Sequence, residues 1–423
     1  MSWTAPLTRA RGGDAIAAAL QTALVAVDPR EAVRRALTAD GSPSPIGPGG
    51  KLHVIAIGKA AVAMTRGAFD VLGDRIADAL VVTKQAPGDD LPAQVLLGAH
   101  PIPGPASLAA AQAVVARARS LGPHDAALVL LSGGASSLVA VPDAAITLTE
   151  LAAVTEGLMR AGAGIDDLNV VRRRLDVLKG GGLAAALTTA RARALVLSDV
   201  LDDDLATIGS GPLVASPDDR HDAMRVLQRY EVRISQHVWA HLAASIAPRM
   251  VPRVPHTIVA NNADAVRACA KRLRDAGYLP RIAEPFVGDA AQTGRVWVDR
   301  LRATGRKTTA EVAGGETTVE LTGPGHGGRT LHLALAAAIA LEGGPAWTLA
   351  TFATDGEDGP TDAAGAVVTA STVARAAAAG IDARQALADC DSYTVFDALG
   401  DLLRPGPTGT NVCDLAVAVW PGA

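Results

Sequence analysis

LHVIAIGKAAVAMTRGAFDVL, residues 52–72, decides the fold class of this chain. The apolar run HVIAI predicts a buried strand, Gly58 and Lys59 then form a turn, and the rest has the apolar spacing of a helix. The same order of strand, glycine turn and helix returns in AALVLLSGGASSL (126–138) and in HTIVANNADAVRACAKRLRDAG (256–277). Strands that alternate with helices in this way predict a parallel, doubly wound α/β sheet.

The pattern changes after about residue 305. AEVAGGETTVELTG (310–323) predicts two short β segments joined by Gly-Gly, and more strands and helices follow. We therefore predict an N-terminal α/β domain over 1–250, a connecting βα segment over 251–305, and a smaller α/β domain over 306–423. A loop is expected over 41–50, where the sequence is GSPSPIGPGG.

The composition argues against several classes of protein. The 39 basic and 43 acidic residues are interspersed, so no surface suited to nucleic acid is expected. No uninterrupted apolar stretch is long enough to span a bilayer, and the N-terminus lacks a signal-peptide pattern. The three cysteines lie far apart without CxxC spacing, which argues against a disulfide framework or a structural zinc site. We expect a protein of the reducing cytoplasm, with no membrane partner.

Two glycine turns after predicted strands suit the binding of anions. Lys59 follows the first strand and opens a helix, where backbone N–H groups and the positive helix end favour phosphate. In the second turn, two glycines allow a close backbone approach and three hydroxyls supply donors. Its candidate ligands are Ser132, Gly133, Gly134, Ser136 and Ser137. The alternatives are an exposed turn lysine and a plain serine N-cap.

Further charged residues stand close to glycines or strand ends. Arg172 and Lys179 lie within VRRRLDVLKGGGL (171–183) and could neutralise phosphates, although the glycines alone would be an ordinary helix C-cap. Asp199 ends another apolar strand and could hold a metal ion or orient a substrate. Asp355 begins the acidic segment DGEDGPTD, whose hard oxygen ligands suit Mg²⁺ that carries phosphates. A solvated acidic loop is the alternative for that segment.

Two more segments combine glycines with polar side chains. GPGHGGR (323–329) contains GxGxxG, which is similar to a dinucleotide fingerprint but lacks the acid expected about 20 residues later. Gly328 and Arg329 in it could instead form a clamp for carboxylate or phosphoryl oxygen. Thr408 and Asn411 precede the last strand and suit nucleotide or phosphate contacts, with a simple turn as the alternative.

Taken in order, these segments resemble the class II glycerate kinases, the glycerate 2-kinase family with a C-terminal MOFRL domain. The resemblance spans nearly the whole chain. It is carried by IGKAA (57–61), HPIP (100–103), LSGGASSL (131–138), VRRRLDVLKGGGLA (171–184), LSDV (197–200), IGSGP (208–212), GGETTV (314–319), GGR (327–329), TDGEDGPTDAAGA (354–366) and GPTGTNVCDL (406–415).

The resemblance implies a Rossmann-like α/β/α domain, a C-terminal MOFRL domain and an active site in the cleft between them. It implies Mg²⁺-dependent transfer of the ATP γ-phosphoryl group to D-glycerate, which gives 2-phosphoglycerate. Lys59 and Arg329 occupy the positions thought to be catalytic. Lys179 and the loop 132–137 would hold anionic oxygens, and Asp199 or Asp355 would hold Mg²⁺ or orient the glycerate hydroxyl.

The chain departs from the family pattern near these segments. Thr330-Leu331-His332 replaces the usual Asn-Gln-Glu, and Arg174, Asp176 and Asp202 replace His, Ser and Gly. A kinase for a related small hydroxy acid therefore remains an alternative, as do a nicotinamide-dependent hydroxypyruvate reductase and a metabolite-binding protein without turnover. The choice of the 2-hydroxyl rests on the resemblance. The oligomeric state stays open, with a homodimer among the options.

Overall fold

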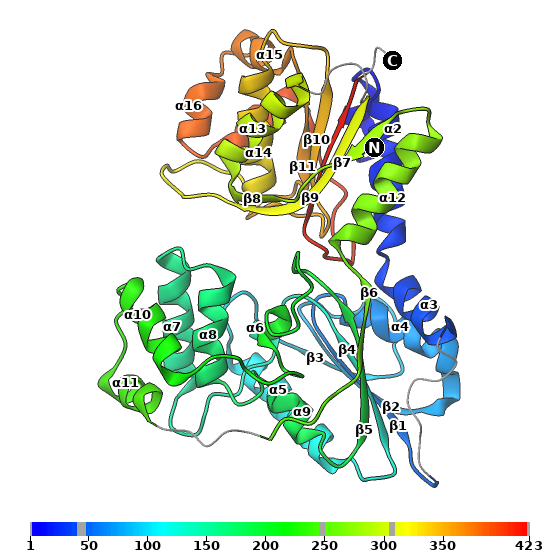
Figure 1. Ribbon diagram of the computed structural model, residues 1–423, viewed down its shortest axis with the longest axis vertical. Coiled ribbons are helices and arrows are strands. Elements are labelled where there is room, and N and C mark those ends of the chain that lie inside the picture. The colour runs from blue at the N-terminus through cyan, green and yellow to red at the C-terminus, as the bar shows by residue number, and fades with distance from the viewer. Residues whose placement is uncertain (1, 40–47, 245–249, 304–308, 421–423) are drawn as a thin grey trace. The chain divides into compact units, whose positions relative to one another are not determined.

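The computed structural model of the protein describes residues 2–39, 48–244, 250–303 and 309–420. Most of the loop expected over 41–50 and the predicted boundary at 305 lie outside these residues. The chain divides into two compact units. We call Pro29–Ala260 the parallel-sheet unit, and Met1–Asp28 together with Asn261–Ala423 the mixed-sheet unit (Figure 1).

The parallel-sheet unit is built on six parallel strands in the order β3-β2-β1-β4-β5-β6. All six residues of β4 are buried, which explains why that strand reads as an unbroken apolar run. The strands are β1 (Leu52–Ile57), β2 (Ile76–Thr83), β3 (Gln94–Leu97), β4 (Ala126–Leu131), β5 (Arg191–Leu197) and β6 (His256–Ala260).

Helices connect consecutive strands, except for the loop between β2 and β3, as the alternating pattern predicted, so the doubly wound α/β class is confirmed. The α-helices are α3 (Pro29–Ala39), α4 (Ala61–Leu72), α5 (Pro105–Ser120), α6 (Ala135–Leu138), α7 (Leu148–Arg160), α8 (Ile165–Leu175), α9 (Gly182–Ala186), α10 (Arg220–Arg229) and α11 (Gln236–Ala243). Short 3₁₀ turns lie at Gly73–Arg75 and Ile208–Ser210.

The mixed-sheet unit has a sheet in the order β12-β11-β10-β13-β9-β7, with β8 also paired to β9. Strands β7 and β8 run parallel to β9, while the remaining pairs are antiparallel. The strands are β7 (Pro280–Ile282), β8 (Phe286–Asp289), β9 (Ala310–Thr318), β10 (Thr348–Ala353), β11 (Gly365–Thr369), β12 (Leu402–Leu403) and β13 (Asp414–Val419). The helices are α1 (Ala5–Thr8), α2 (Gly13–Ala26), α12 (Asn262–Asp275), α13 (Ala290–Ala303), α14 (Arg329–Leu341), α15 (Thr372–Ala378), α16 (Ala383–Ala388) and α17 (Ser392–Leu399).

Strand β9 corrects one expectation. Gly314 and Gly315 do not separate two β segments, because β9 runs through both of them. A side chain at Gly314 would place its Cβ 1.6 Å from Oδ1 of Asn262, and one at Gly315 would place it 2.3 Å from the carbonyl oxygen of Phe286. The glycines therefore allow α12 and β8 to approach the strand, rather than forming a turn.

The N-terminal segment belongs to the mixed-sheet unit, which differs from the division predicted from the sequence. Helix α2 packs along α12, and Figure 1 shows the two helices side by side. Asn262 at the start of α12 donates hydrogen bonds to the carbonyl oxygens of Val412 and Asp414, at 2.8 and 3.1 Å. Within the described residues, no helix has both the length and the apolar character needed to cross a bilayer.

We expect Leu20→Ala to destabilise the protein, because Leu20 is fully buried in α2. A leucine truncated to alanine in a core costs about 2–5 kcal/mol. Urea unfolding measures the loss, and Gln21→Ala, at the exposed neighbouring position, is the matched control. Equal stability of the two variants would contradict the packing of this segment in the unit.

Candidate active site

The carboxyl ends of the parallel strands meet at one edge of the six-stranded sheet. Lys59 stands two residues after β1, and Lys84 directly follows β2. Gly133 and Asp199 stand two residues after β4 and β5. The chain proceeds from β1 outward to β2 and β3, then returns to place β4 on the other side of β1. Ligands of open α/β sheets bind at such a reversal of strand order.

Two turns interlock where β1 and β4 end. The backbone N–H of Lys59 donates to the carbonyl oxygen of Gly133 at 2.9 Å. The hydroxyl of Ser132 accepts a hydrogen bond from the backbone N–H of Ala60 at 3.1 Å. Gly58 has a φ of +135°, and a Cβ there would lie 2.1 Å from Oγ of Ser132. Glycine is therefore required at position 58 for the turns to meet.

The predicted hydroxyl ligands in the turn after β4 already have protein partners. Ser137 donates to the carbonyl oxygen of Pro101 at 2.6 Å, and Ser136 shares a 2.6 Å hydrogen bond with Ser210. Ser132, described above, accepts from a backbone N–H. These serines shape the loop, and their contact with a ligand stays a prediction.

Side chains pack closely over the two glycines of this turn. A Cβ at Gly134 would lie 3.2 Å from Cγ of Lys59 and 3.3 Å from Cδ2 of His100. A Cβ at Gly133 would lie 2.2 Å from Oδ2 of Asp199. The glycines thus leave room for a lysine, a histidine and a carboxylate beside the same turn, as their predicted role in close approach requires.

His100 stands beside the turn after β4, and the charges of three other basic side chains act on it. We call these four residues the cation cluster: Lys59, Lys84, His100 and Arg172. Burial, together with the positive charges of Lys59, Lys84 and Arg172, lowers the pKa of His100 to about 4. A histidine that resists protonation for these reasons marks a positive potential suited to an anion.

Arg172 differs from the other members of the cation cluster in combining burial with the lack of a bonded partner among the described residues. The residue is 8% exposed, and within the described part of the chain its guanidinium makes neither a hydrogen bond nor an ion pair. Burial lowers its pKa to about 10, against the attraction of Asp176. An uncompensated buried charge costs several kcal/mol, so a negatively charged ligand would stabilise this arrangement.

Lys179, in contrast, is buried and already bonded to protein groups. It is 3% exposed, and its ammonium donates to Asp176 at 2.5 Å and to the carbonyl oxygen of Val139 at 3.2 Å. Asp176 also accepts from the backbone N–H of Leu178 at 2.9 Å. Asp176, which stands where the family pattern has serine, is therefore the ion-pair partner of Lys179. Its predicted role with phosphate stays a prediction.

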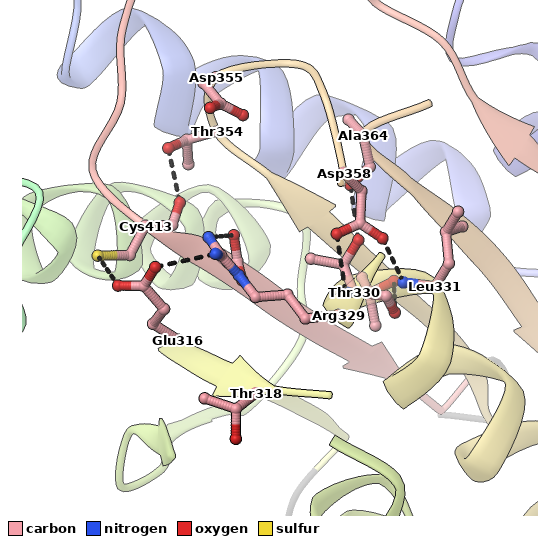
Figure 2. A network of polar contacts seen from close by, with 12 residues as sticks. Glu316, Thr318, Arg329, Thr330, Leu331, Thr354, Asp355, Asp358, Ala364 and Cys413 are labelled. Atoms are coloured by element: carbon pink, nitrogen blue, oxygen red, sulfur yellow. Dashed lines mark hydrogen bonds and ion pairs between the residues drawn. The ribbon is translucent and has the colours of Figure 1, made fainter. Parts of the chain in front are cut away.

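A second polar network lies in the mixed-sheet unit (Figure 2). Arg329, the first residue of α14, donates to both carboxylate oxygens of Asp414 at 2.6 and 3.1 Å. Its remaining terminal nitrogen lies 2.9 Å from a carboxylate oxygen of Glu316. Burial alone would lower the pKa of Arg329, but these carboxylates raise it. Burial raises the pKa of Asp414 to about 7, although Arg329 opposes that shift.

Asp358 caps the N-terminus of α14. Its carboxylate accepts from the backbone N–H groups of Thr330 and Leu331, at 3.1 and 2.8 Å, and the residue is 2% exposed. A Cβ at Gly328 would lie 2.3 Å from the Asp358 carboxyl carbon, so glycine there makes room for the cap. The helix N–H groups that a dinucleotide pyrophosphate would need are therefore occupied by a protein carboxylate.

The first two glycines of the GxGxxG segment also serve packing. A Cβ at Gly323 would lie 2.5 Å from the carbonyl oxygen of Asp389, and a Cβ at Gly325 would lie 2.4 Å from it. The backbone N–H of Gly325 donates to that same oxygen at 2.8 Å. The segment is thus a close backbone crossing, which explains the motif without a dinucleotide.

Two loops pair next to Asp355, which Figure 2 shows above Thr354. The backbone N–H of Thr408 donates to the carbonyl oxygen of Asp355 at 3.2 Å, and the Thr408 hydroxyl donates to that of Thr354. The Asn411 side chain accepts from the backbone N–H of Cys413 at 3.3 Å. Thr408 and Asn411 thus hold the loop in shape. Their contact with nucleotide, and metal binding by Asp355, stay predictions.

The departures from the family pattern at 330–332 point into the protein. The Thr330 hydroxyl donates to the carbonyl oxygen of Ala364 at 3.0 Å, and Leu331 is fully buried in the core. His332 is 7% exposed, and burial lowers its pKa. All three side chains therefore serve the packing of α14.

Sequence reasoning did not select five of these residues as site residues: Lys84, His100, Glu316, Asp358 and Asp414. Lys84 carried a usable signal, because it follows its strand directly. Asp358 belongs to the acidic segment 355–362, but nothing in the sequence indicated its contact with the α14 N-terminus or the contacts of Glu316 and Asp414 with Arg329, because these pairings depend on tertiary packing.

We expect His100 to stay neutral down to about pH 5. Since folding lowers its pKa from 6.5 to about 4, neutral His100 contributes stability that is complete above pH 6.5 and lost as the pH falls toward 4. NMR titration of the imidazole measures this. Lys84→Met should raise the pKa, whereas Lys271→Met, on the other unit, should not. A pKa of His100 near 6.5 in the unaltered protein would contradict both the burial of its imidazole and the approach of the three cations to it.

Two family descriptions match the chain. "Domain of unknown function (DUF4147)" matches residues 15–243, and "MOFRL family" matches residues 309–414. A solved structure of glycerate kinase from Thermotoga maritima is 34% identical, covers 95% of this chain and 97% of its own, and superposes with a TM-score of 0.82.

Curated relatives match over most of their length. D-glycerate 2-kinase from Thermotoga maritima is 36% identical over 380 residues, which is 87% of this chain and 90% of that protein. A protein from Agrobacterium vitis, provisionally named hydroxypyruvate reductase, is 37% identical over 93% of this chain and 91% of its own.

Proposed function

The chain belongs to the glycerate kinase family with a C-terminal MOFRL domain, and from this premise we propose that it is a glycerate 2-kinase. It transfers the γ-phosphoryl group of ATP to the 2-hydroxyl of D-glycerate, giving 2-phosphoglycerate and ADP. The observation that carries the proposal is the buried guanidinium of Arg172 in the cation cluster, which has no hydrogen-bond or ion-pair partner among the residues that the structure describes. Both substrates of this reaction are anions, and such a cluster neutralises anionic oxygens.

Phosphoryl transfer needs alignment and charge neutralisation more than covalent chemistry. Lys59 is proposed as a catalytic residue because its backbone is fixed at the reversal of strand order and its side chain lies beside His100. When an anion binds, its negative charge would raise the pKa of His100, against the effect of the surrounding cations.

Arg329 is proposed as the second catalytic residue. Asp414 and Glu316 hold its guanidinium in one orientation, and its side chain is still 34% exposed. A planar guanidinium fixed in this way presents a directed positive charge to developing phosphoryl charge at no cost of reorientation. Asp358 contributes indirectly, because it fixes the helix turn that carries Arg329.

Mg²⁺ is proposed as the partner of ATP, with Asp199 or Asp355 as its protein ligand. Within the described residues, no group of three or more histidine, cysteine or acidic side chains could hold a metal ion. Magnesium in kinases is held by one or two carboxylates together with substrate phosphates and water, so a single aspartate is a sufficient protein ligand for the proposal. The ion would supply further neutralisation of phosphate charge.

We keep a Rossmann-like N-terminal domain and a MOFRL domain as the two parts of the protein. Cys269, Cys390 and Cys413 are buried and form no disulfide within the described residues, and the reducing cytoplasm is proposed as the protein's location. The oligomeric state, including a homodimer, carries no argument from the described residues.

A hydroxypyruvate reductase is the second candidate, because one relative carries that name. The capped N-terminus of α14 weighs against it, since Asp358 already accepts from Thr330 and Leu331. A kinase for another small hydroxy acid is less favoured than glycerate as substrate, because the departures at 330–332 face the core.

The identity of the reaction is tested by NMR of the products formed from Mg²⁺-ATP and D-glycerate. We expect 2-phosphoglycerate and ADP. ATP binding without product would direct the search to other three- or four-carbon hydroxy acids. Oxidation of NADH by hydroxypyruvate, without ATP turnover, would replace the kinase by the reductase.

The two proposed catalytic residues are tested by Lys59→Ala and Arg329→Ala. Loss of one donor to developing charge lowers kcat by about 10²–10³-fold, and we expect at least this from each variant. Lys51→Ala and Arg274→Ala are matched controls, because both side chains are exposed. Circular dichroism checks the fold. A variant with near-normal kcat would remove its residue from the mechanism.

A further inference from the structure

We propose that the mixed-sheet unit contains a separate binding site for a small phosphate monoester. A cavity of about 520 Å³ lies between residues 6–11 and the ends of β10 and β11. We call it the arginine pocket, because its lining includes Arg9, Arg11, Arg375, Asp401, Thr369 and Ser371. Its volume lies within the range of about 300–1,000 Å³ that is typical of small-molecule sites.

The arginine pocket lies at the end of β10 away from Arg329. Thr348, the first residue of β10, lines the pocket and pairs with Thr369 of β11. Ala353, the last residue of β10, pairs with Asp414, which holds Arg329. Six residues of strand span roughly 17–20 Å. The pocket is therefore distinct from the Arg329 network and does not depend on the proposed kinase reaction.

The charges that line the pocket do not balance. Asp401 accepts from Arg375 at 2.8 and 3.3 Å and lies 3.9 Å from Arg9. Within the described residues, the guanidinium of Arg11 makes no hydrogen bond or ion pair. Three positive charges against one negative leave a surplus of two, and a phosphate monoester carries about −1.5 to −2 at pH 7. A monocarboxylate would leave part of that surplus uncompensated.

Backbone contacts hold the side chains of Arg375 and Arg9, and the main chain of Arg11, in place. Arg375 donates to the carbonyl oxygen of Leu399 at 2.9 Å, and Arg9 donates to that of Gly400. The hydroxyl of Thr348 donates to the carbonyl oxygen of Arg11 at 2.8 Å, which ties this residue to the start of β10. A site whose donors are positioned beforehand loses little entropy when its ligand binds.

The lining also limits the size and kind of ligand. Hydroxyls of Thr369 and Ser371, 3.0 Å apart, stand at the end of β11 and can donate to phosphoryl oxygens. Trp347, the aromatic residue of the lining, is 3% exposed and packs edge-on against Trp420. It offers no open face for a nucleobase. The ligand is thus a compact phosphorylated compound rather than a nucleotide.

Isothermal titration calorimetry with glycerol 1-phosphate tests the site. We expect binding by the unaltered protein that weakens at least tenfold in Arg11→Ala. Arg274→Ala, which removes one exposed positive charge elsewhere on the same unit, should bind within twofold of the unaltered protein. Because the Arg11 side chain makes no hydrogen bond or ion pair within the described residues, its variant should keep the melting temperature and the kcat of the unaltered protein.

Arg172→Met distinguishes the arginine pocket from the cation cluster. It should retain the binding of glycerol 1-phosphate, because Arg172 belongs to the other unit. Binding lost in Arg172→Met and kept in Arg11→Ala would place the anion at the cation cluster and overturn the proposal. Absence of binding at millimolar ligand in the unaltered protein would also overturn it.

Discussion

The carboxylate of Asp358 on the N-terminus of α14 is the contact on which the arrangement of the mixed-sheet site depends. It satisfies two backbone N–H groups that would otherwise be buried without partners. It also requires glycine at position 328 and fixes the first turn of the helix, which carries Arg329. Because a protein anion fills the helix end, Arg329 rather than the helix N-terminus would supply the positive charge in the proposed reaction.

The parallel-sheet unit gathers positive charge in the cation cluster, where the Arg172 guanidinium has no hydrogen bond or ion pair within the described residues. Parallel pairing brings the strand ends to one edge, and interlocked glycine turns hold Lys59 and His100 against the same backbone. The buried guanidinium of Arg172 is costly without an anion. A cluster of this kind is stable enough to fold yet gains most when an anionic substrate arrives, which is what a kinase for a small acid requires.

The sequence predicted the parallel sheet and the placement of Lys59 and Asp199 at strand ends, because local apolar patterns and glycine turns determine both. It misjudged Gly314 and Gly315, since a glycine pair that admits a neighbouring backbone looks the same as one that forms a turn. It also missed Asp358, Glu316 and Asp414 as partners around Arg329. Those contacts join residues far apart in the chain, and such pairing is fixed by tertiary packing rather than by local pattern.

The central claim is that the cation cluster binds the anionic groups of the substrates. A crystal structure of the protein with ADP and D-glycerate tests it most directly. The account predicts a phosphate or carboxylate oxygen within hydrogen-bond distance of the Arg172 guanidinium and next to Lys59. Ligands bound elsewhere, with Arg172 still unpaired, would contradict the account.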